Sequence, residues 1–101
     1  MKPNEYKLST RVWIYPTHAG WHFVSIPPKE TEDISQKFNY LKRGWGSLRV
    51  KVTVGKTTWN TSIFPDKKEG IYLLPIKKEV RKKENISANQ RIKCIVEILI
   101  S

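Results

Sequence analysis

The chain has 101 residues, 39% of them hydrophobic, and its 19 Lys and Arg against 9 Asp and Glu give a formal net charge of +10. This length allows one core and one domain, the composition excludes a disordered chain, and a single cysteine excludes an internal disulfide or a cysteine-based zinc cluster. Because no charged-then-apolar leader and no apolar run of membrane length occurs, we expect a cytoplasmic protein with no membrane partner.

The N-terminal part of the chain predicts a β-hairpin. From Tyr6 to Tyr15 apolar and polar residues alternate, which is typical of a strand with one buried face. Proline and glycine interrupt the alternation within residues 16–20 and supply turn chemistry. A second β-prone run follows at Trp21–Ile26, so we expect the two runs to pair.

A short amphipathic helix is predicted after the Pro27-Pro28 pair. Proline ends a strand because it lacks a backbone donor, but it is tolerated in the first turn of a helix. Ile34, Phe38 and Leu41 then recur at i, i+4 and i+7 and form one apolar stripe. We expect about three turns of helix laid on a sheet, with Gly44 as the stop.

Three further strands are predicted in the middle of the chain. Ser47–Val54 alternates between apolar residues and a partly basic face, and Thr57–Phe64 is its partner. Gly55-Lys56 fits a two-residue type II′ turn, which needs glycine at its first central position. The polar segment 65–70 predicts a turn before a short strand at Ile71–Leu74.

The C-terminal part predicts a basic helix and a closing strand. Ile76 and Val80 lie four residues apart, while lysines and arginines occupy the other side of this segment. The final run, Arg91–Ile100, alternates but carries apolar residues on both sides, so we expect a strand buried on two faces. We interpret Cys94, which belongs to the inward set, as a buried structural thiol.

The two halves of the chain share one order of elements. In the first half, Phe23–Pro27 supplies a strand ending in a proline, and a short amphipathic helix and another strand follow. In the second half, Tyr72–Pro75 is followed by the same two elements. The repeat is one of architecture and not of residue identity. We therefore expect a mainly β fold with two short helices: a small barrel with a helix on each side.

Two resemblances extend this expectation. The second half, from its apolar strand through Pro75 and Lys77–Lys83 to the last strand, resembles the swapped-hairpin AbrB-type transcription factors. In those proteins the same pattern builds half of a DNA-binding barrel. They usually have Gly-Asp before the last strand, where this chain has Asn89-Gln90.

The second resemblance covers nearly the whole chain. It rests on residues 21–27 (WHFVSIP), 44–47 (GWGS), 59–65 (WNTSIFP) and 72–77 (YLLPIK), followed by Val80-Arg81. This series is similar to DUF1905, a family of uncharacterised small domains. The resemblance implies a double-split β-barrel related to the AbrB class, formed by one domain over residues 1–101. Some relatives carry this domain beside one linked with bacteriocin protection.

We find no pattern that predicts catalysis or metal binding. Ser62 is the best-placed hydroxyl for a nucleophile, but no sequence feature brings His18 or His22 to it as a base. The same two histidines lack a third metal ligand at a usual spacing. We therefore expect a protein that is not an enzyme and has no cofactor.

Cations and aromatic residues form the candidate binding site. Guanidinium groups bind phosphate through two parallel hydrogen bonds, and nucleobases stack on indole rings. The candidate residues are Arg43, Trp45, Arg49, Trp59, Ser62, Lys77, Arg81 and Lys82. The alternative is a solvated helix face with tryptophans in the barrel core, which we favour for Trp59. Arg81 has an alternative of its own: we expect it to pair with a carboxylate, such as Asp66 or Glu97, as readily as with a ligand.

Two main functions follow from these residues. The first is non-enzymatic binding of an anionic partner such as nucleic acid through the basic face of the second half. The second is a protein-interaction or accessory domain, with Trp13, Tyr15 and Trp45 as an exposed aromatic patch. A small-ligand pocket inside the barrel is a third alternative. The sequence leaves the oligomeric state open.

Overall fold

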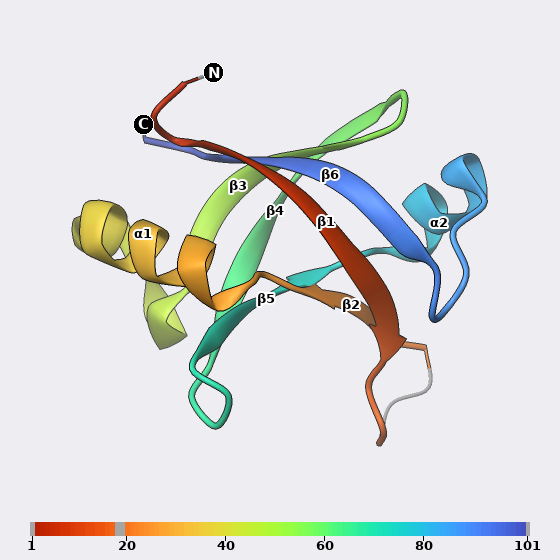
Figure 1. Cartoon of the computed structure of the whole chain (residues 1–101), viewed down its shortest axis with the longest axis horizontal. Coiled ribbons are helices and arrows are strands. Elements are labelled where there is room, and N and C mark those ends of the chain that lie inside the picture. Colours follow the sequence, from red (N-terminus) through yellow and green to blue (C-terminus); the bar gives the residue numbers. More distant parts are fainter. Residues whose placement is uncertain (1, 18–19, 101) are drawn as a thin grey trace.

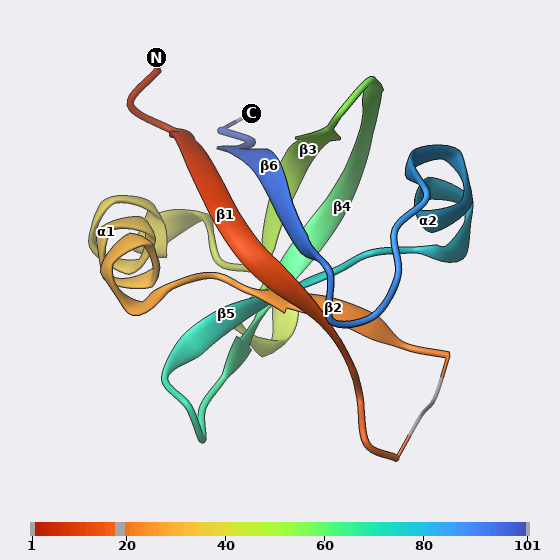
Figure 2. The ribbon, with the colours of Figure 1, turned by 45° about the vertical axis from the view of Figure 1, so that its right-hand side comes forward.

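The computed structural model describes residues 2–17 and 20–100, and in these residues six antiparallel strands close into a barrel in the order β1-β2-β5-β4-β3-β6. The strands are β1 (Glu5–Ile14), β2 (His22–Ser25), β3 (Leu48–Val54), β4 (Thr57–Asp66), β5 (Ile71–Pro75) and β6 (Arg91–Ile98). The helices are α1 (Pro28–Phe38) and α2 (Lys78–Glu84), with 3-10 turns at Asn39–Leu41 and Gly44–Gly46. Figures 1 and 2 show α1 and α2 on opposite sides of the barrel. The predicted mainly β class with two short helices is confirmed.

The core lies inside the barrel and under the two helices. Alternate residues of the strands point inward, so the apolar half of each predicted alternation is buried. The fully buried side chains include Val12, Val24, Ile26, Leu48, Val50, Val52, Ile63, Leu74, Val96 and Ile98. From α1, Ile34 and Phe38 are buried, and Val80 is the buried residue of α2. The predicted core positions Ile34, Phe38 and Val80 are therefore confirmed, whereas Leu41 is half-buried in the 3-10 turn after α1 and Ile76, though buried, precedes α2.

Both predicted hairpins form. β1 pairs with β2, with Trp13 opposite Phe23, and β3 pairs with β4, with Val54 opposite Thr57. Gly55 has a φ of 58°, as the first central position of a type II′ turn requires. Within the part of the chain that the structure describes, no helix has the length and apolar character needed to span a membrane.

The two strand–proline–helix units meet where β2 pairs with β5. Val24 lies opposite Leu74 at the centre of this pairing. On one side of it the Ile26 N–H donates to the Tyr72 carbonyl at 2.9 Å, and on the other the Ile76 N–H donates to the His22 carbonyl at 2.9 Å. The predicted repeat of architecture is present in the order of the elements, which is β2, α1, β3 in the first half and β5, α2, β6 in the second.

The prediction that a turn begins at residue 65 is wrong, because β4 continues through Pro65 to Asp66. Pro65 lies opposite Tyr72. The Tyr72 N–H donates to Oγ1 of Thr31 at 3.3 Å, and its carbonyl accepts from the Ile26 N–H, directly after β2. Tyr72 therefore directs its backbone groups away from β4, and Pro65 can occupy the ladder without the donor that it lacks.

The prediction that the closing strand is buried on two faces is also wrong. Cys94 and its alternate neighbours face the core, but on the other side Lys93 is exposed and Ile95 and Glu97 are half-buried. In the closed barrel β6 lies between β1 and β3. It is central within the sheet, yet its outer face is not covered by a helix, because α1 and α2 pack elsewhere on the barrel.

The helix ends also differ from the prediction. α1 ends at Phe38 and continues into a 3-10 turn, well before the predicted stop at Gly44. α2 runs from Lys78 to Glu84 and is capped by Asn85, whose left-handed φ of 53° lets its N–H reach the carbonyls of the last turn. Helix ends are poorly specified by an apolar stripe alone, because the stripe records burial and not capping.

Candidate binding site

A groove of about 760 Å³ lies on the outer side of β2 and β5 and is called the aromatic groove below. Its apolar walls are formed by Trp21, Phe23, Trp45, Phe64, Leu73 and Pro75. Three cations, Lys77, Lys78 and Arg81, line it as well. The groove therefore combines flat apolar surfaces with positive charge from the start and middle of α2.

The register of the strands explains why these residues meet. Val24 and Leu74 face the core, so their neighbours Phe23, Leu73 and Pro75 face outward. Phe23 lies opposite Pro75, and Phe64 lies opposite Leu73. Apolar residues thus occupy outward positions on three adjacent strands. A contiguous outward apolar surface of this kind is typical of a binding site, whereas scattered exposed apolar residues are not.

Further aromatic rings hold Phe23 in place. The ring of Trp13 lies 5.3 Å from that of Phe23, between centroids, and the rings of Tyr15 and Trp21 lie at 6.0 and 6.4 Å. Trp13 also donates from Nε1 to Oγ of Ser25 at 3.0 Å. These distances are those of favourable aromatic pairs, so one wall of the aromatic groove is supported by a cluster behind it.

Trp45 stands at the tip of a tight turn. Its side chain is 94% exposed and its φ is 64°, a left-handed conformation that is rare for a bulky residue. The turn is closed by two backbone hydrogen bonds, from Arg43 N–H to the Ser47 carbonyl at 2.8 Å and from Gly46 N–H to the Arg43 carbonyl at 2.9 Å. Backbone strain of this kind concentrates at functional positions. Trp45 is therefore the strongest single pointer to a site in this groove.

Arg81 links α2 to the strand on the other side of the groove. Its Nε donates to the Ile76 carbonyl at 3.1 Å and its Nη2 to the Gly20 carbonyl at 3.4 Å. Its Nη1 lies 3.5 Å from Nε2 of His22, while Nδ1 of His22 lies 3.2 Å from the Gly20 carbonyl. Since guanidinium only donates, this geometry assigns the His22 proton to Nδ1 and leaves Nε2 as the acceptor.

The alternative in which Arg81 pairs with a carboxylate is not what the structure has. Asp66 accepts from the Lys68 N–H of its own turn at 3.1 Å, and Glu97 forms salt bridges with Lys2 and Lys51 at 3.5 and 3.8 Å. Arg81 instead uses neutral acceptors and keeps its full positive charge beside the groove.

The structure brings together three of the eight predicted site residues, Trp45, Lys77 and Arg81. Arg43 and Arg49 line a separate hollow of about 160 Å³. The Arg49 Nη1 donates to Oγ of Ser62 at 3.0 Å.

The two remaining residues lie elsewhere. Trp59 packs against the barrel core, as the alternative interpretation proposed. Lys82 is exposed on α2 and does not line the groove. The predicted continuous basic face is therefore divided, because β3 and α2 turn their cations to different surfaces.

Sequence reasoning missed most of the apolar wall. Trp21, Phe23, Phe64 and Leu73 were treated as ordinary strand residues. A usable signal was present, because Phe23 and Leu73 occupy outward positions in alternations whose inward set is already apolar. Of the predicted exposed patch, Trp13 and Tyr15 are half-buried in the aromatic cluster, and only Trp45 is fully exposed. His18 lies outside the described residues.

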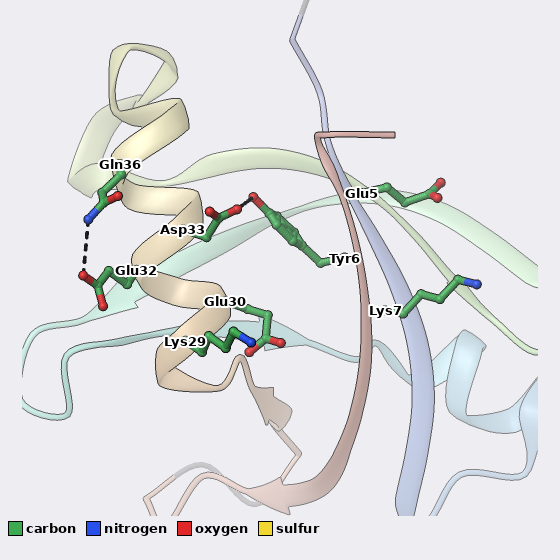
Figure 3. A pocket seen from close by; sticks show the side chains of 8 residues that line it. All are labelled: Glu5, Tyr6, Lys7, Lys29, Glu30, Glu32, Asp33 and Gln36. Carbon is green, nitrogen blue, oxygen red and sulfur yellow. Dashed lines mark hydrogen bonds between the residues drawn. The ribbon is translucent and has the colours of Figure 1, made fainter. Parts of the chain in front are cut away.

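A second hollow, of about 430 Å³, lies between β1 and α1 (Figure 3). Tyr6 points from β1 toward α1 and donates to Oδ2 of Asp33 at 2.6 Å, and Lys37 forms a salt bridge with the same atom at 3.2 Å. Burial raises the pKa of Tyr6, and the hydrogen bond to Asp33 raises it further.

This second hollow contains charges of both signs. Lys7 and Lys29 line it together with Glu5, Glu30, Glu32 and Asp33. Its central polar groups pair with one another, so we assign it a structural role in attaching α1 to the barrel. Among the residues that the structure describes, no three His, Cys, Asp or Glu side chains gather in a way that could hold a metal ion.

The fold and the groove define a class of protein: a small closed β-barrel with flanking helices and an apolar groove with cations on its outer face. The chain matches the model of a domain of unknown function, DUF1905, over residues 9–96, and it belongs to that family. The match runs from β1 into β6, so it includes every strand that forms the aromatic groove. No curated protein matches the sequence significantly.

Proposed function

We propose that this protein is a non-enzymatic binding domain whose anionic partner is single-stranded nucleic acid, held in the aromatic groove. One observation carries the proposal: flat side chains (Trp21, Trp45, Phe64) and cations (Lys77, Lys78, Arg81) line the same groove. Bases stack on aromatic rings, and lysine and arginine contact the phosphates that connect them.

The aromatic walls favour an unpaired strand over a duplex. In a duplex the faces of the bases are stacked on one another, and a protein that contacts phosphates alone needs no aromatic wall. An unpaired strand presents both faces of its bases. Trp45, which is 94% exposed, and Phe64, which is 42% exposed, are available for stacking. The net charge of +10 also speeds encounter with any polyanion.

A protein partner is the second candidate function. It is favoured by the composition of the groove, because exposed tryptophan on an apolar surface is typical of an interaction hot spot. Trp45 would then insert into a pocket of the partner. The two candidates differ in salt dependence: nucleic acid binding weakens steeply as salt rises, whereas an apolar protein contact changes little.

The test is a titration of the protein with a fluorescent oligonucleotide of about 12 nucleotides at several salt concentrations. We expect Trp45→Ala to weaken binding roughly tenfold, since stacking contributes about 1–3 kcal/mol per base. The double variant Lys77→Ala/Lys78→Ala should lower the slope of log affinity against log salt by about 1.4, from two contacts of about 0.7 each.

A matched control is available on the opposite side of the barrel. Lys29→Ala/Lys37→Ala removes the same charge from exposed positions on α1. Equal effects of the two double variants would mean that net charge alone attracts the oligonucleotide. Absence of binding at low salt would reject the nucleic acid proposal. Recovery of a protein partner that is lost on Trp45→Ala would then favour the second candidate.

We further propose that the barrel is of the double-split type and related to the AbrB class. Support comes from the two strand–proline–helix units, whose first strands β2 and β5 pair with each other and whose last strands β3 and β6 also pair. Superposition of residues 22–54 on residues 72–98 tests this relationship, and a poor fit would reject it. We also propose a cytoplasmic location, which cell fractionation tests.

A further inference from the structure

A second cationic surface lies on the outer side of β1 and β6. It consists of Lys7 and Arg11 on β1 and Arg91 and Lys93 on β6, and is called the β1–β6 face below. All four side chains are exposed. Arg11 lies directly opposite Arg91, and Lys93 lies opposite Ser9, between the two β1 cations. Four positive charges thus follow one another along a two-stranded ladder.

The positive charge of this face is not compensated within the described residues. Their salt bridges involve Lys2, Lys37 and Lys51, and none of the four cations of the face. By contrast, Lys51, farther along the same outer surface, pairs with Glu97 at 3.8 Å. Like charges placed directly opposite each other destabilise a sheet. Their concentration here therefore calls for a reason other than stability.

The two arginines are held in place without being neutralised. Arg11 donates from Nη1 to the Asn89 carbonyl at 2.7 Å, and Arg91 donates from Nη1 to the Ser9 carbonyl at 3.0 Å. Each guanidinium has five N–H donors in a fixed fork, so further donors remain for a ligand. Anchoring to neutral carbonyls orients the fork and leaves its charge intact, which suits binding of phosphate oxygens.

A shallow hollow of about 440 Å³ adds donors on the same face. Its lining includes Lys7, Lys93, Ser9 and Thr53, beside the apolar residues Leu8, Cys94 and Ile95. The Thr53 hydroxyl also shares a 3.0 Å hydrogen bond with that of Thr58. Ammonium and hydroxyl groups are donors to phosphate oxygens and carry no sequence information. The hollow therefore suits the backbone of a nucleic acid better than its bases.

The β1–β6 face continues into the aromatic groove. After Arg11, the next outward residue of β1 is Trp13, and the Trp13 ring lies 5.3 Å from that of Phe23 in the groove wall. The path from the groove to the face thus runs along one strand. A ligand that leaves the groove beside Phe23 reaches the arginines without crossing a carboxylate of β1, because Glu5 lies at the far end of the strand.

We propose that the β1–β6 face binds the phosphate backbone of the same single strand as it leaves the aromatic groove. This inference rests on the proposed function and specifies it: bases stack in the groove, and the flanking phosphates are held by the face without sequence preference. The complementarity of charge between the four uncompensated cations and a chain of phosphates is the reason for this choice of occupant.

The test compares an oligonucleotide of about 4 nucleotides with one of about 12, both titrated against the full chain. Only the longer strand should reach both surfaces. Lys7→Ala/Lys93→Ala changes two exposed lysines that form no salt bridge among the described residues. Lys29→Ala/Lys37→Ala is the control of equal charge, in which the salt bridge of Lys37 with Asp33 is also lost. We expect the first variant to weaken binding of the longer oligonucleotide and lower its salt slope by about 1.4. Its affinity for the shorter one should equal that of the control.

The outcomes separate this inference from the proposed function. If Lys7→Ala/Lys93→Ala and the control bind the longer oligonucleotide alike, the proposed role of the β1–β6 face is rejected, while that of the aromatic groove is kept. If Trp45→Ala changes the affinity for neither oligonucleotide but Lys7→Ala/Lys93→Ala weakens binding of the longer one, the proposed role of the aromatic groove is rejected and that of the β1–β6 face is kept. Absence of binding to both oligonucleotides at low salt overturns both. Unchanged thermal melting of each variant confirms that the fold survives.

Discussion

The Tyr6 hydroxyl donates a 2.6 Å hydrogen bond to Oδ2 of Asp33, and this contact joins β1 to α1 (Figure 3). Tyr6 is only 7% exposed, so most of its ring stays packed when the hydroxyl alone is removed. We expect Tyr6→Phe to lower the melting temperature by about 5 °C, the usual effect of one lost hydrogen bond in a domain of this size. An unchanged melting temperature would mean that the contact contributes nothing to stability.

The same contact predicts a dependence of stability on acid pH. The hydrogen bond from Tyr6 is the largest influence and lowers the pKa of Asp33; burial opposes it to a smaller extent, and the hydrogen bond and charge of Lys37 lower the pKa further. The unfolded carboxyl therefore takes up its proton at a higher pH than the folded one, at about pH 4. The stabilisation is complete above that pH and is lost as the pH falls through the folded pKa.

The measurement is thermal melting from pH 7 down to about pH 2.5. Asp33→Asn should flatten the acid part of this curve relative to the unmodified protein. Glu32→Gln is the matched control, because Glu32 is exposed on the same helix and, among the described residues, its side chain accepts a hydrogen bond from Gln36 alone, at 3.2 Å. Parallel acid curves for all three proteins would contradict the assignment.

Cys94 should be unreactive in the native state. It is 2% exposed, and burial raises the pKa of its thiol from 9.0 to about 11. At pH 8 the thiolate population is therefore reduced roughly a hundredfold, and the thiolate is the reactive form. We expect alkylation by iodoacetamide, followed by mass spectrometry, to be slow in buffer and fast in denaturant. The chain has one cysteine, so the label is unambiguous; equal rates would contradict its burial.

Gly55 is required for two separable reasons. Its φ of 58° is unfavourable for other residues, and an added Cβ would collide with the carboxylate of Glu84, which accepts a 2.6 Å hydrogen bond from Thr57. We expect Gly55→Ala to cost about 1–2 kcal/mol from the left-handed backbone, with a smaller additional cost for moving the flexible Glu84 carboxylate away from Thr57. In a Glu84→Ala background only the first cost should remain. A double-mutant cycle of unfolding free energies measures the difference, and additive effects would refute the collision.

Strain and binding at Trp45 can be tested separately. Because its φ is 64°, Trp45→Gly relieves the left-handed strain, whereas Trp45→Ala keeps it. We expect the Gly variant to be more stable than the Ala variant by about 1 kcal/mol in denaturant unfolding. Both variants should lose oligonucleotide affinity to the same extent. Retained affinity in either one would show that the indole ring is not part of the site.

Much of the fold could be predicted from local patterns. The alternation around Val12, Val50 and Val96 predicted strands with correctly assigned inward faces. Both incorrect predictions depend on contacts that are distant in the sequence. Proline lacks a donor and so predicts a strand end at Pro65, but whether that donor is needed depends on where Tyr72 directs its backbone groups. The apolar outer residues of β6 predict burial, but the pattern does not report which strands a helix covers.

By itself, the sequence determined the strands, the type II′ turn at Gly55 and the apolar stripes of both helices, because periodicity and turn chemistry depend on residues close together in the chain. Only the tertiary structure decided which side chains share a surface. Barrel closure and strand register bring Trp45 to Lys77 and Arg81, turn Arg49 toward Ser62, and set Arg11 opposite Arg91. These neighbours come from distant parts of the chain, and a shift of one residue in register would turn each strand side chain to the other face.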